Sequence, residues 1–503
     1  MLRYLLTPQR LLDTTAYNTD AVISCLMQAQ TASLFILVIT STAVFFKNNY
    51  SSKKGLSRIY STLMPIAFYL GLFLQLIIFF LLIDRPVWGE TLWEYRSCNV
   101  LTRWELIGGY VFSLDFFGSA LILLAYVVGF LSLLCLTDRV FWKNSKHAVW
   151  FSYFLLIVVL FTTSDDLYLF FIFYELLLLP SAILVYYNSV NKRGVKASLY
   201  FLIWTQLGSI LVLLAVIIIV RSTGSSDLAE IRSFYTVNAV PTGVKMLVFF
   251  GFGFKFPIWP FHFWLSKTHV EATGSFSMYL SGFLVKTAVF GFYKVYLALN
   301  FPDSNEIFIA IAVFSTVDAS LKLWAQVDLK KIVAYCTVQE MNLIILCFLF
   351  GPCDLIIVGV LFCIMHGLLS SIMFFTVDCL QRRFQSRQTA ALTGVLQVAP
   401  TLGVFIIIMV LSFMGLPGTL KFTCELALYS ALFDLSPLLF LLVLIPVSFI
   451  APVSFARHWF GCLFGSPNKS QQVTNDVDSR ELAIHVFCNA TLVLLSFTSL
   501  SFF

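Results

Sequence analysis

The sequence predicts an all-α protein that crosses a membrane many times. Of its 503 residues, 59% are hydrophobic and only 12% are charged, whereas a soluble domain carries roughly 25% charged residues. Apolar runs long enough to cross about 30 Å of hydrocarbon recur along the whole chain. Two of these runs are interrupted by proline near a charged residue, a pattern typical of membrane transport proteins. We therefore predict a polytopic membrane protein with about 14 transmembrane helices.

The predicted spans follow the apolar runs in order, with about 20 residues expected for each. The twelfth run is long and broken. The approximate ranges are 21–46, 60–83, 108–136, 148–164, 167–187, 197–220, 243–263, 274–298, 306–324, 329–350, 354–378, 394–432, 437–455 and 482–502.

Loop charge supports an even number of spans. Lysine and arginine concentrate in the loops that follow odd-numbered spans, as at Lys53 and Arg382, whereas alternate loops such as 164–166 are poor in them. The loop at 84–107 is the exception, because it carries both signs. By the positive-inside rule, the basic loops face the compartment of synthesis and both chain ends face away from it.

Composition also narrows the functional classes. The eleven cysteines form no Cys-x-x-Cys pair, so we expect no metal or iron–sulfur site. No glycine-rich phosphate loop follows a strand pattern, so nucleotide binding has no support. The net charge of +6 comes from the loops and indicates membrane topology rather than a nucleic-acid partner.

Two spans are broken by proline. The seventh contains Gly-Phe-Lys-Phe-Pro-Ile-Trp-Pro at 253–260, and the twelfth contains Gly-Leu-Pro-Gly-Thr at 415–419, with Glu425 shortly after it. An interrupted helix exposes backbone polar groups, which is tolerated only where protein or water surrounds them. We therefore expect both breaks to line a transport path. The residues that break the helices are Pro257, Pro260, Pro417 and Gly418.

The two breaks also predict an internal repeat. They lie five spans apart, and because five is odd, two five-span units would be related by inversion in the membrane. The first repeat comprises spans 4–8 and the second spans 9–13, each with one broken helix. Glu175 then corresponds to Glu340, and Lys255 corresponds to Glu425. The predicted segments are N-terminal spans at 1–147, the first repeat at 148–298, the second repeat at 299–455, and a linker with the last span at 456–503.

Six ionisable side chains fall well inside the predicted spans. Each costs at least about 2.5–3.5 kcal/mol at a helix centre, so together they must pair or line a wet cavity. We therefore take them as candidates for proton transfer, and Asp115 is a further candidate nearer the end of a span. The six are Glu175, Lys255, Lys286, Glu340, His366 and Glu425.

The residues alone leave alternatives open. Glu175 needs a cation, and Lys255 is the candidate, yet a buried ion pair can also serve only to fix helix register. Lys286 is too central to reach an interface, so it either exchanges a proton or is held by backbone carbonyls. His366 can carry a proton near neutral pH, but a lone histidine within a span is often a packing residue.

Polar residues close to the ends of spans are expected at the membrane interface. His262 and His269 lie near the loop end of the seventh span. Lys330 and Lys331 follow Asp328 at the start of the tenth span, where a basic cluster acts as an orientation signal.

Several ordered segments match a known family. They are Phe173-Tyr-Glu175, the run from Lys255 to Ala272, Leu284-Val-Lys286, the run from Asp328 to Tyr335, and His366-Gly-Leu-Leu-Ser-Ser371. Together they resemble the antiporter-like subunits of respiratory complex I, over most of the chain from the third span onward. Glu425 is similar to the twelfth-span glutamate of one branch of that family, whose two sister branches are expected to carry lysine there.

This resemblance implies a hydrated line of titratable groups along the membrane midplane. Glu175 and Lys255 would form an ion pair that faces a neighbouring subunit. Lys286 would be the central proton carrier. The first hundred residues show little resemblance to the family.

The resemblance also implies roles for the remaining candidates. His366 with Glu340 would relay the proton onward, and Glu425 would be the terminal group towards the next subunit. The chain departs from the family at Glu340, where a histidine is usual, so an acidic site replaces a neutral one. It departs again at Thr273 and Phe276, where the family commonly has proline and glycine.

The function implied by the resemblance is proton translocation driven by electron transfer from NADH to ubiquinone. NADH, FMN, the iron–sulfur clusters and ubiquinone would bind to other subunits, and this chain would hold no cofactor. Its partners would be other membrane-arm subunits, including the sister subunits 2 and 5, and lipids of the mitochondrial inner membrane. Two rival interpretations are a subunit of a multi-component cation/proton antiporter and a structural membrane subunit that does not pump.

Overall fold

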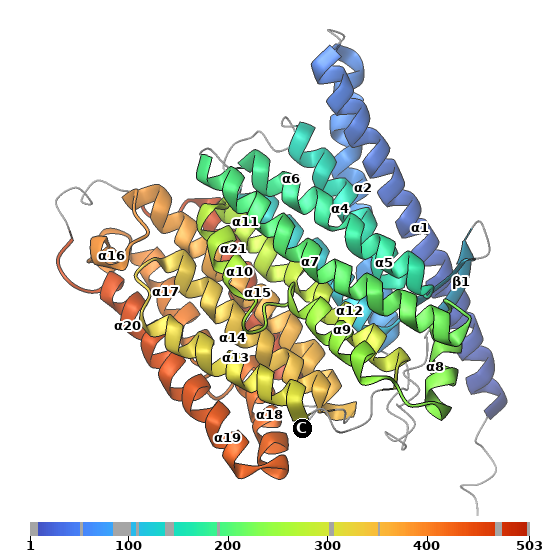
Figure 1. Ribbon diagram of the computed structural model, residues 1–503. Helices are drawn as coiled ribbons and strands as arrows, with labels where there is room; N and C mark the ends of the chain where they lie inside the picture. Colours follow the sequence, from blue (N-terminus) through green and yellow to red (C-terminus); the bar gives the residue numbers. More distant parts are fainter. Residues whose placement is uncertain are drawn as a thin grey trace, which may run out of the picture. The chain divides into compact units, whose positions relative to one another are not determined.

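The computed structural model is helical almost throughout its described residues, which confirms the predicted fold class (Figure 1). The chain forms two compact units: unit 1 comprises 1–126, 140–180 and 226–229, and unit 2 comprises the remainder. Lys53 and most of the mixed-charge loop at 84–107 lie outside the described residues. The described residues are 9–50, 54–83, 102–106, 110–135, 145–188, 192–300, 306–350, 353–467 and 475–499.

Unit 1 is built from long apolar helices and one strand hairpin. Its elements are α1 (Gln9–Tyr50), α2 (Lys54–Ile83), β1 (Thr102–Leu106), β2 (Tyr110–Leu114), the first part of α3 (Phe116–Cys135), α4 (Ser145–Thr163) and α5 (Leu167–Leu176). Helix α1 packs against α2 and α4, and Ser41 Oγ lies 2.7 Å from Ser152 Oγ between α1 and α4. Gln75 of α2 donates a hydrogen bond to the carbonyl of Ser119 on α3, at 2.9 Å.

The third span is shorter than the sequence predicted. Its helix begins at Phe116 rather than near residue 108, because β2 pairs antiparallel with β1 and places Thr102 opposite Leu114. The residues of β2 are largely aromatic or β-branched, and these favour strands when a partner is available. Asp115 then starts the helix, since its carboxylate accepts the N–H of Gly118 at 2.6 Å.

Unit 2 holds the rest of α3 and most of α6 and α8, together with all later elements. Helix α8 lies in a region that the sequence predicted to be loop. The elements are α6 (Leu178–Asn188), α7 (Lys192–Thr223), α8 (Leu228–Val237), α9 (Thr242–Gly253), α10 (Phe263–Glu271), α11 (Gly274–Tyr279), the π-helix η2 (Leu280–Leu284), α12 (Val285–Ala298), α13 (Glu306–Trp324), α14 (Leu329–Leu349), α15 (Cys353–Phe384), the 3₁₀-helix η3 (Thr389–Ala391), α16 (Val395–Val398), α17 (Pro400–Phe413), α18 (Leu420–Leu435), α19 (Pro437–Leu444), the π-helix η4 (Ile445–Ile450), α20 (Ala451–Leu463) and α21 (Ser479–Ser499).

The core of unit 2 consists of α12, α14 and α15. Helix α14 packs against α10, α13 and α15, and almost all of its residues are buried. A helix that is buried on every side belongs to the interior of a bundle rather than to its lipid-facing surface. The candidate side chains on these helices therefore lie inside protein.

By length and composition, nine helices among the described residues could cross a membrane, and four shorter helices are also apolar. Together they fall in order on the predicted spans from the first to the thirteenth. The range predicted for the ninth span, 306–324, coincides with α13. The total of 14, the inverted relation between spans 4–8 and 9–13, and the four segment boundaries remain predictions.

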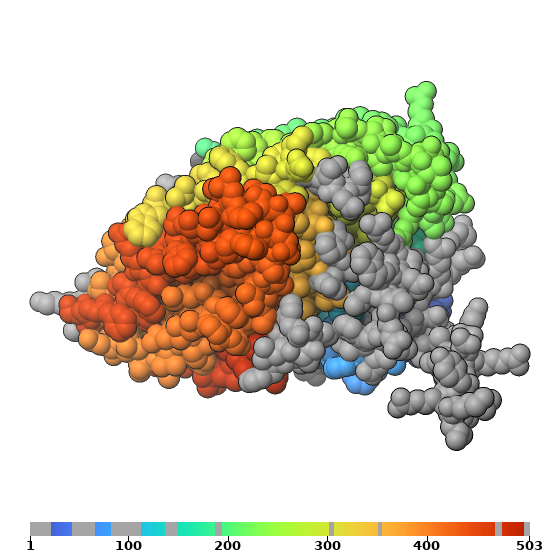
Figure 2. All heavy atoms as spheres, turned by 90° about the horizontal axis from the view of Figure 1, so that it is seen from below, coloured from blue at the N-terminus to red at the C-terminus, as the bar shows by residue number. Residues whose placement is uncertain are grey.

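Helices at the surface of unit 2 expose large apolar side chains. Figure 2 shows the orange-red surface of α18–α20 next to the yellow surface of α13, and α13 contacts both α19 and α20. Leu438, Phe449 and Val453 are more than half exposed on this face, as is Phe314 of α13. Such a face suits hydrocarbon as its solvent.

The last helix, α21, is held to α17 by hydrogen bonds of the segment before it and to α15 by an ion pair. Asp476 accepts hydrogen bonds from the backbone N–H groups of Thr401, at 3.0 Å, and Leu402, at 3.4 Å, at the start of α17. Burial disfavours the charged carboxylate, but the hydrogen bonds from Thr401, Val477 and Leu402 outweigh it and lower the pKa of Asp476. Arg383 of α15 is also paired with Glu481 of α21.

Candidate functional site

The six side chains singled out by the sequence lie on different segments. Glu175 is near the end of α5 in unit 1, and Lys255 follows α9 in unit 2. Their expected ion pair stays a prediction. The other four belong to unit 2, with Lys286 on α12, Glu340 on α14, His366 on α15 and Glu425 on α18.

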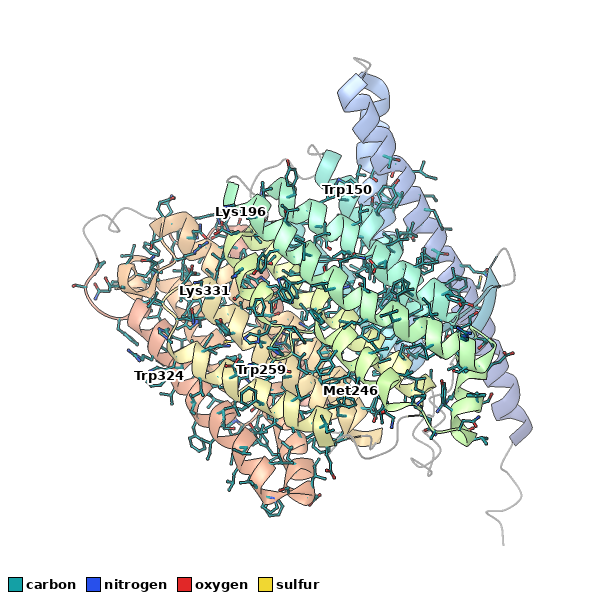
Figure 3. The ribbon with its side chains drawn as sticks, viewed as in Figure 1. Trp150, Lys196, Met246, Trp259, Trp324 and Lys331 are labelled. Atoms are coloured by element: carbon teal, nitrogen blue, oxygen red, sulfur yellow. The ribbon has the colours of Figure 1, made fainter. Side chains whose placement is uncertain are left out.

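The first break comprises residues 254–262, between α9 and α10. Lys255 lies within it and is 3% exposed, whereas Trp259, labelled in Figure 3, is on the surface. Three neighbouring segments satisfy the backbone groups that the break frees, as an apolar surrounding demands. The hydrogen bonds run from Trp264 Nε1 to Phe254 O at 2.7 Å, from Asn342 Nδ2 to Pro257 O at 3.2 Å, and from Trp259 N to Ser315 Oγ at 3.1 Å.

The second break comprises residues 414–419, between α17 and α18. Gly415 and Gly418 have φ of 68° and 93°, which residues with a Cβ adopt only with strain. The Thr419 hydroxyl donates to the carbonyl of Leu416 at 2.7 Å and accepts the N–H of Phe422 at 3.3 Å, so it caps α18. This break is therefore held by its own residues.

Lys286 is positioned by a local change in helix type. The π-helix η2 lies between α11 and α12 and ends at Leu284, two residues before Lys286 in the first turn of α12. The Lys286 ammonium donates to the carbonyl of Ser281 within η2. A Cβ at Gly282 would meet Gly367 O and Ser371 Oγ of α15, so glycine allows η2 and α15 to approach closely.

Glu340 binds two partners through its two carboxylate oxygens. Oε1 lies 2.8 Å from Nζ of Lys421, and Oε2 is bonded to Nδ1 of His366. Glu340 and His366 are each 1% exposed. Because a carboxylate only accepts hydrogen bonds, the imidazole must present an N–H at Nδ1.

Lys421 also contacts a second carboxylate, that of Glu425. Its Nζ lies 3.5 Å from Glu425 Oε1, one helical turn later on α18, and 3.8 Å from the centre of the Phe413 ring. Lys421 is 3% exposed and Glu425 6% exposed. A cation over an aromatic face is stabilised by the ring quadrupole, so the ammonium has three favourable contacts in the interior.

Lys286 acts electrostatically on the same group of side chains. Its charge interacts with both His366 and Glu340. We call Lys286, His366, Glu340, Lys421 and Glu425 the polar line, and Glu340, Lys421 and Glu425 the triad. The polar line joins four helices that are otherwise largely apolar.

Lys421 was missed by the sequence reasoning, which considered only Glu425 after the second break. Two signals could have identified it. It lies four residues before Glu425, the spacing at which helical side chains face each other, and the residues that follow it form an apolar run. Its partner Glu340 is 81 residues earlier, and no local pattern predicts that contact.

His262 and His269, which the sequence places near the membrane interface, are both buried inside unit 2. His262 is 3% exposed, and its Nε2 lies 3.0 Å from Lys322 Nζ and 3.4 Å from Asp318 Oδ2 on α13. His269 is fully buried and stacks on Phe374, with ring centres 4.3 Å apart. Helix α10 turns back into unit 2 instead of leaving the protein, which carries both rings inside.

The basic cluster at the start of α14 also has a structural role. Lys330 is buried and donates to the carbonyl of Ala272 at 2.7 Å, and Arg387 donates to the carbonyl of Val270 at 2.7 Å. Arg387 is in turn paired with Asp328 at 2.8 Å. Cations at the carboxyl end of a helix satisfy its last carbonyls and its dipole, so this cluster fixes the end of α10.

Within the described residues, no group of three or more His, Cys, Asp or Glu side chains could hold a metal ion. In the polar line, His366, Glu340, Lys421 and Glu425 contact one another in series, and the Lys286 ammonium donates to the carbonyl of Ser281. The chemistry that this arrangement supports is proton binding and transfer.

Comparison with known proteins identifies related chains. The family model described as NADH:quinone oxidoreductase/Mrp antiporter, TM, matches residues 164–451. NADH-ubiquinone oxidoreductase chain 4 of Paramecium tetraurelia is 42% identical over 391 residues, which cover 78% of this chain and 82% of that protein. Several other relatives align over about half of their own length.

Two solved structures have a similar fold. A chain of respiratory complex I from Thermus thermophilus with bound NADH superposes with a TM-score of 0.74 at 20% identity, over 93% of this chain and 95% of that chain. A chain of the Mrp complex from Dietzia sp. DQ12-45-1b gives a TM-score of 0.75 at 16% identity, over 94% and 95%. Identities this low establish the fold alone.

Proposed function

The chain belongs to the NADH:quinone oxidoreductase/Mrp antiporter transmembrane family, and on this premise we propose that it is a proton-translocating membrane-arm subunit of respiratory complex I. It corresponds to subunit 4, as the Paramecium relative does by name. It works within a multi-subunit membrane complex, with the sister subunits 2 and 5 as neighbours, in the mitochondrial inner membrane. Electron transfer from NADH to ubiquinone takes place in other subunits, which hold the FMN and the iron–sulfur clusters.

The observation that carries this proposal is the polar line. Charged groups inside apolar helices cost free energy, and a protein keeps them where they pair or carry protons and ions. In this chain four of the five members contact one another directly, and the fifth, Lys286, acts on them electrostatically. A contact series of lysine, histidine and carboxylate suits proton transfer better than it suits packing.

Buried polar atoms that make no hydrogen bond add support. His366 Nε2, Glu425 Oε1 and both amide atoms of Gln339 make no hydrogen bond with any described residue. Such atoms are costly unless water reaches them. A hydrated line would satisfy them and would supply the path between Lys286 and His366.

The proposed roles of the residues are those that the resemblance to the family implies. Glu175 and Lys255 would be the ion pair that faces one neighbouring subunit. Lys286 holds the central proton, His366 with Glu340 passes it on, and Glu425 is the last group. Weakening the attraction between Glu175 and Lys255 changes the field at Lys286, because charges couple strongly where the dielectric constant is low.

A second candidate function is a subunit of a multi-component cation/proton antiporter. The family description names Mrp antiporters, and the Dietzia Mrp chain has a similar fold. Purification separates the two functions. A complex I subunit co-purifies with NADH-oxidising subunits, whereas an antiporter subunit does not, and its complex exchanges cations for protons without NADH.

The test of proton translocation is Lys286→Met in the assembled complex. Methionine has a similar length and no charge, so packing is largely kept. The complex is purified and reconstituted into phospholipid vesicles, and NADH oxidation is measured together with acidification of the lumen. We expect NADH oxidation to continue with fewer protons moved per NADH.

The matched control is Lys196→Met. Lys196 is exposed on α7 and is labelled in Figure 3, so its loss should leave the proton yield unchanged. A normal proton yield in Lys286→Met would instead identify the chain as a structural subunit whose charges serve packing.

A further inference from the structure

The net charge of the polar line is zero only because Lys421 contributes a positive charge. With Lys286 and Lys421 protonated and both carboxylates ionised, Lys286, Glu340, Lys421 and Glu425 sum to zero. If one proton moves from Lys286 to Glu425, the sum is again zero. Since a net charge in a buried site is costly, both positions of the proton avoid that cost.

Without Lys421 neither state is neutral. Both would carry one net negative charge, because two carboxylates would then face a single ammonium at most. The other titratable groups close to the triad are Cys336, Cys424 and Tyr429. Thiols and phenols are neutral near pH 7, so they do not alter this count.

The two carboxylates are not equivalent proton acceptors. Both oxygens of Glu340 already accept, one from Lys421 and one from His366, and hydrogen bonds of this kind favour a charged carboxylate. Glu425 Oε1 lies farther from the ammonium, at 3.5 Å, and is ion-paired with it without making a hydrogen bond to any described residue. Glu425 is therefore the carboxylate whose charged form is held by fewer hydrogen bonds, and the better acceptor of a proton.

We propose that Lys421 couples Glu340 to Glu425, so that the polar line shares one exchangeable proton, which lies either on Lys286 or on Glu425. The proposal rests on the proposed function and adds a residue to it. It also accounts for the acidic group at position 340, because Lys421 is the cation that this carboxylate needs.

The proton step balances at every group. Lys421 first gives a proton to Glu425 across 3.5 Å, which frees its amine to take one from Glu340 Oε1 across 2.8 Å. Glu340 receives its proton at Oε2 from His366 Nδ1 in the same step, while an N–H bond of the Lys286 ammonium breaks and one forms at His366 Nε2 through the hydrated path. Each intermediate group gains one proton and loses one, so only Lys286 and Glu425 change charge, and His366 changes tautomer until its ring resets.

Infrared absorption of the purified complex tests the coupling, since a protonated carboxylic acid has a C=O stretching band that a carboxylate lacks. In Lys286→Met the proton can lie only on Glu425, so a new band should appear relative to the native complex. Adding Glu425→Gln should remove the band and so assign it. Lys196→Met should show no new band.

Two further variants distinguish the effect of the Lys421 charge on Glu425 from the effect of simple repulsion between the two carboxylates. In Lys286→Met/Glu340→Gln, Lys421 is left with Glu425 alone, and the band should be lost. Adding Lys421→Met removes the last ammonium, and the band should return. All three variants keep the triad neutral, so each is expected to fold.

Three results would overturn the proposal: no band in Lys286→Met, a band that persists after Glu340→Gln, or a band that stays absent after Lys421→Met is added. The infrared result is independent of pumping. A normal proton yield in Lys286→Met therefore contradicts the proposed function, whereas an unchanged band in the Glu340→Gln variant contradicts only the coupling through Lys421.

Discussion

The two helix breaks look alike in sequence and differ in how they are held. The first, at 254–262, relies on side chains of α10, α13 and α14 to bind its backbone. The second, at 414–419, relies on Thr419 and on two glycines with positive φ. The geometry of the first break thus depends on its neighbours, whereas that of the second is set by its own sequence.

The breaks also present their charges differently. Lys255 lies inside the first break, whereas Lys421 and Glu425 lie on the helix that follows the second. Helix α14 contacts both regions through residues two positions apart, because Asn342 binds Pro257 of the first break and Glu340 binds Lys421 beyond the second. Similar sequence patterns therefore do not imply equivalent charged groups, and the predicted correspondence of Lys255 with Glu425 leaves out Lys421.

Among variants that test how the two breaks are held, Asn342→Leu is expected to have the largest effect. The variant leaves the buried carbonyl of Pro257 without its donor, which costs about 1–3 kcal/mol. Hydrogen–deuterium exchange of the complex should become faster at 254–262 and stay unchanged at 414–419. Asn489→Leu is the control, because its amide bonds only a carbonyl of its own helix, at 2.8 Å. Equal exchange in native and Asn342→Leu complexes would mean that the first break is not held by α14.

A smaller effect is expected from alanine at the glycines of the second break. A left-handed backbone costs a residue with a Cβ about 1–2 kcal/mol, so Gly415→Ala and Gly418→Ala should both speed exchange at 414–419 only. A Cβ at Gly415 would also lie 3.2 Å from Glu425 Oε2, whereas one at Gly418 meets nothing within 4 Å. Gly415→Ala should therefore also reduce proton transfer. Identical behaviour of the two variants would exclude a role for the Glu425 contact.

The smallest effect is expected from Thr419→Val, which removes the cap of α18. Loss of such a cap costs about 1 kcal/mol, so amide exchange should rise at the first turn of α18. Thr376→Val is a suitable comparison, since Thr376 bonds only a carbonyl of its own helix at 2.7 Å. If the two variants exchange alike, the second break does not depend on this cap.

The sequence predicted the parts of the molecule that local patterns determine. Apolar runs located α13 to the residue, and proline with glycine located both breaks. The run at 110–114 was ambiguous, because a short apolar stretch suits a strand or a helix equally well, and its strand partner decided the outcome. The burial of His269 and the contacts of Lys421 were not predicted, for a related reason. Their burial depends on how α10 and α18 pack against helices far away in the sequence, which periodicity does not encode.

The π-helix before Lys286 sets the direction in which this lysine faces. Such a segment carries one residue more than an α-helical path of the same length, and each residue turns a helix by about 100°. Deleting a single residue from 280–284 would therefore swing the ammonium by more than a quarter turn, away from α14 and α15. The rotational setting of Lys286 is thus encoded in one inserted amino acid.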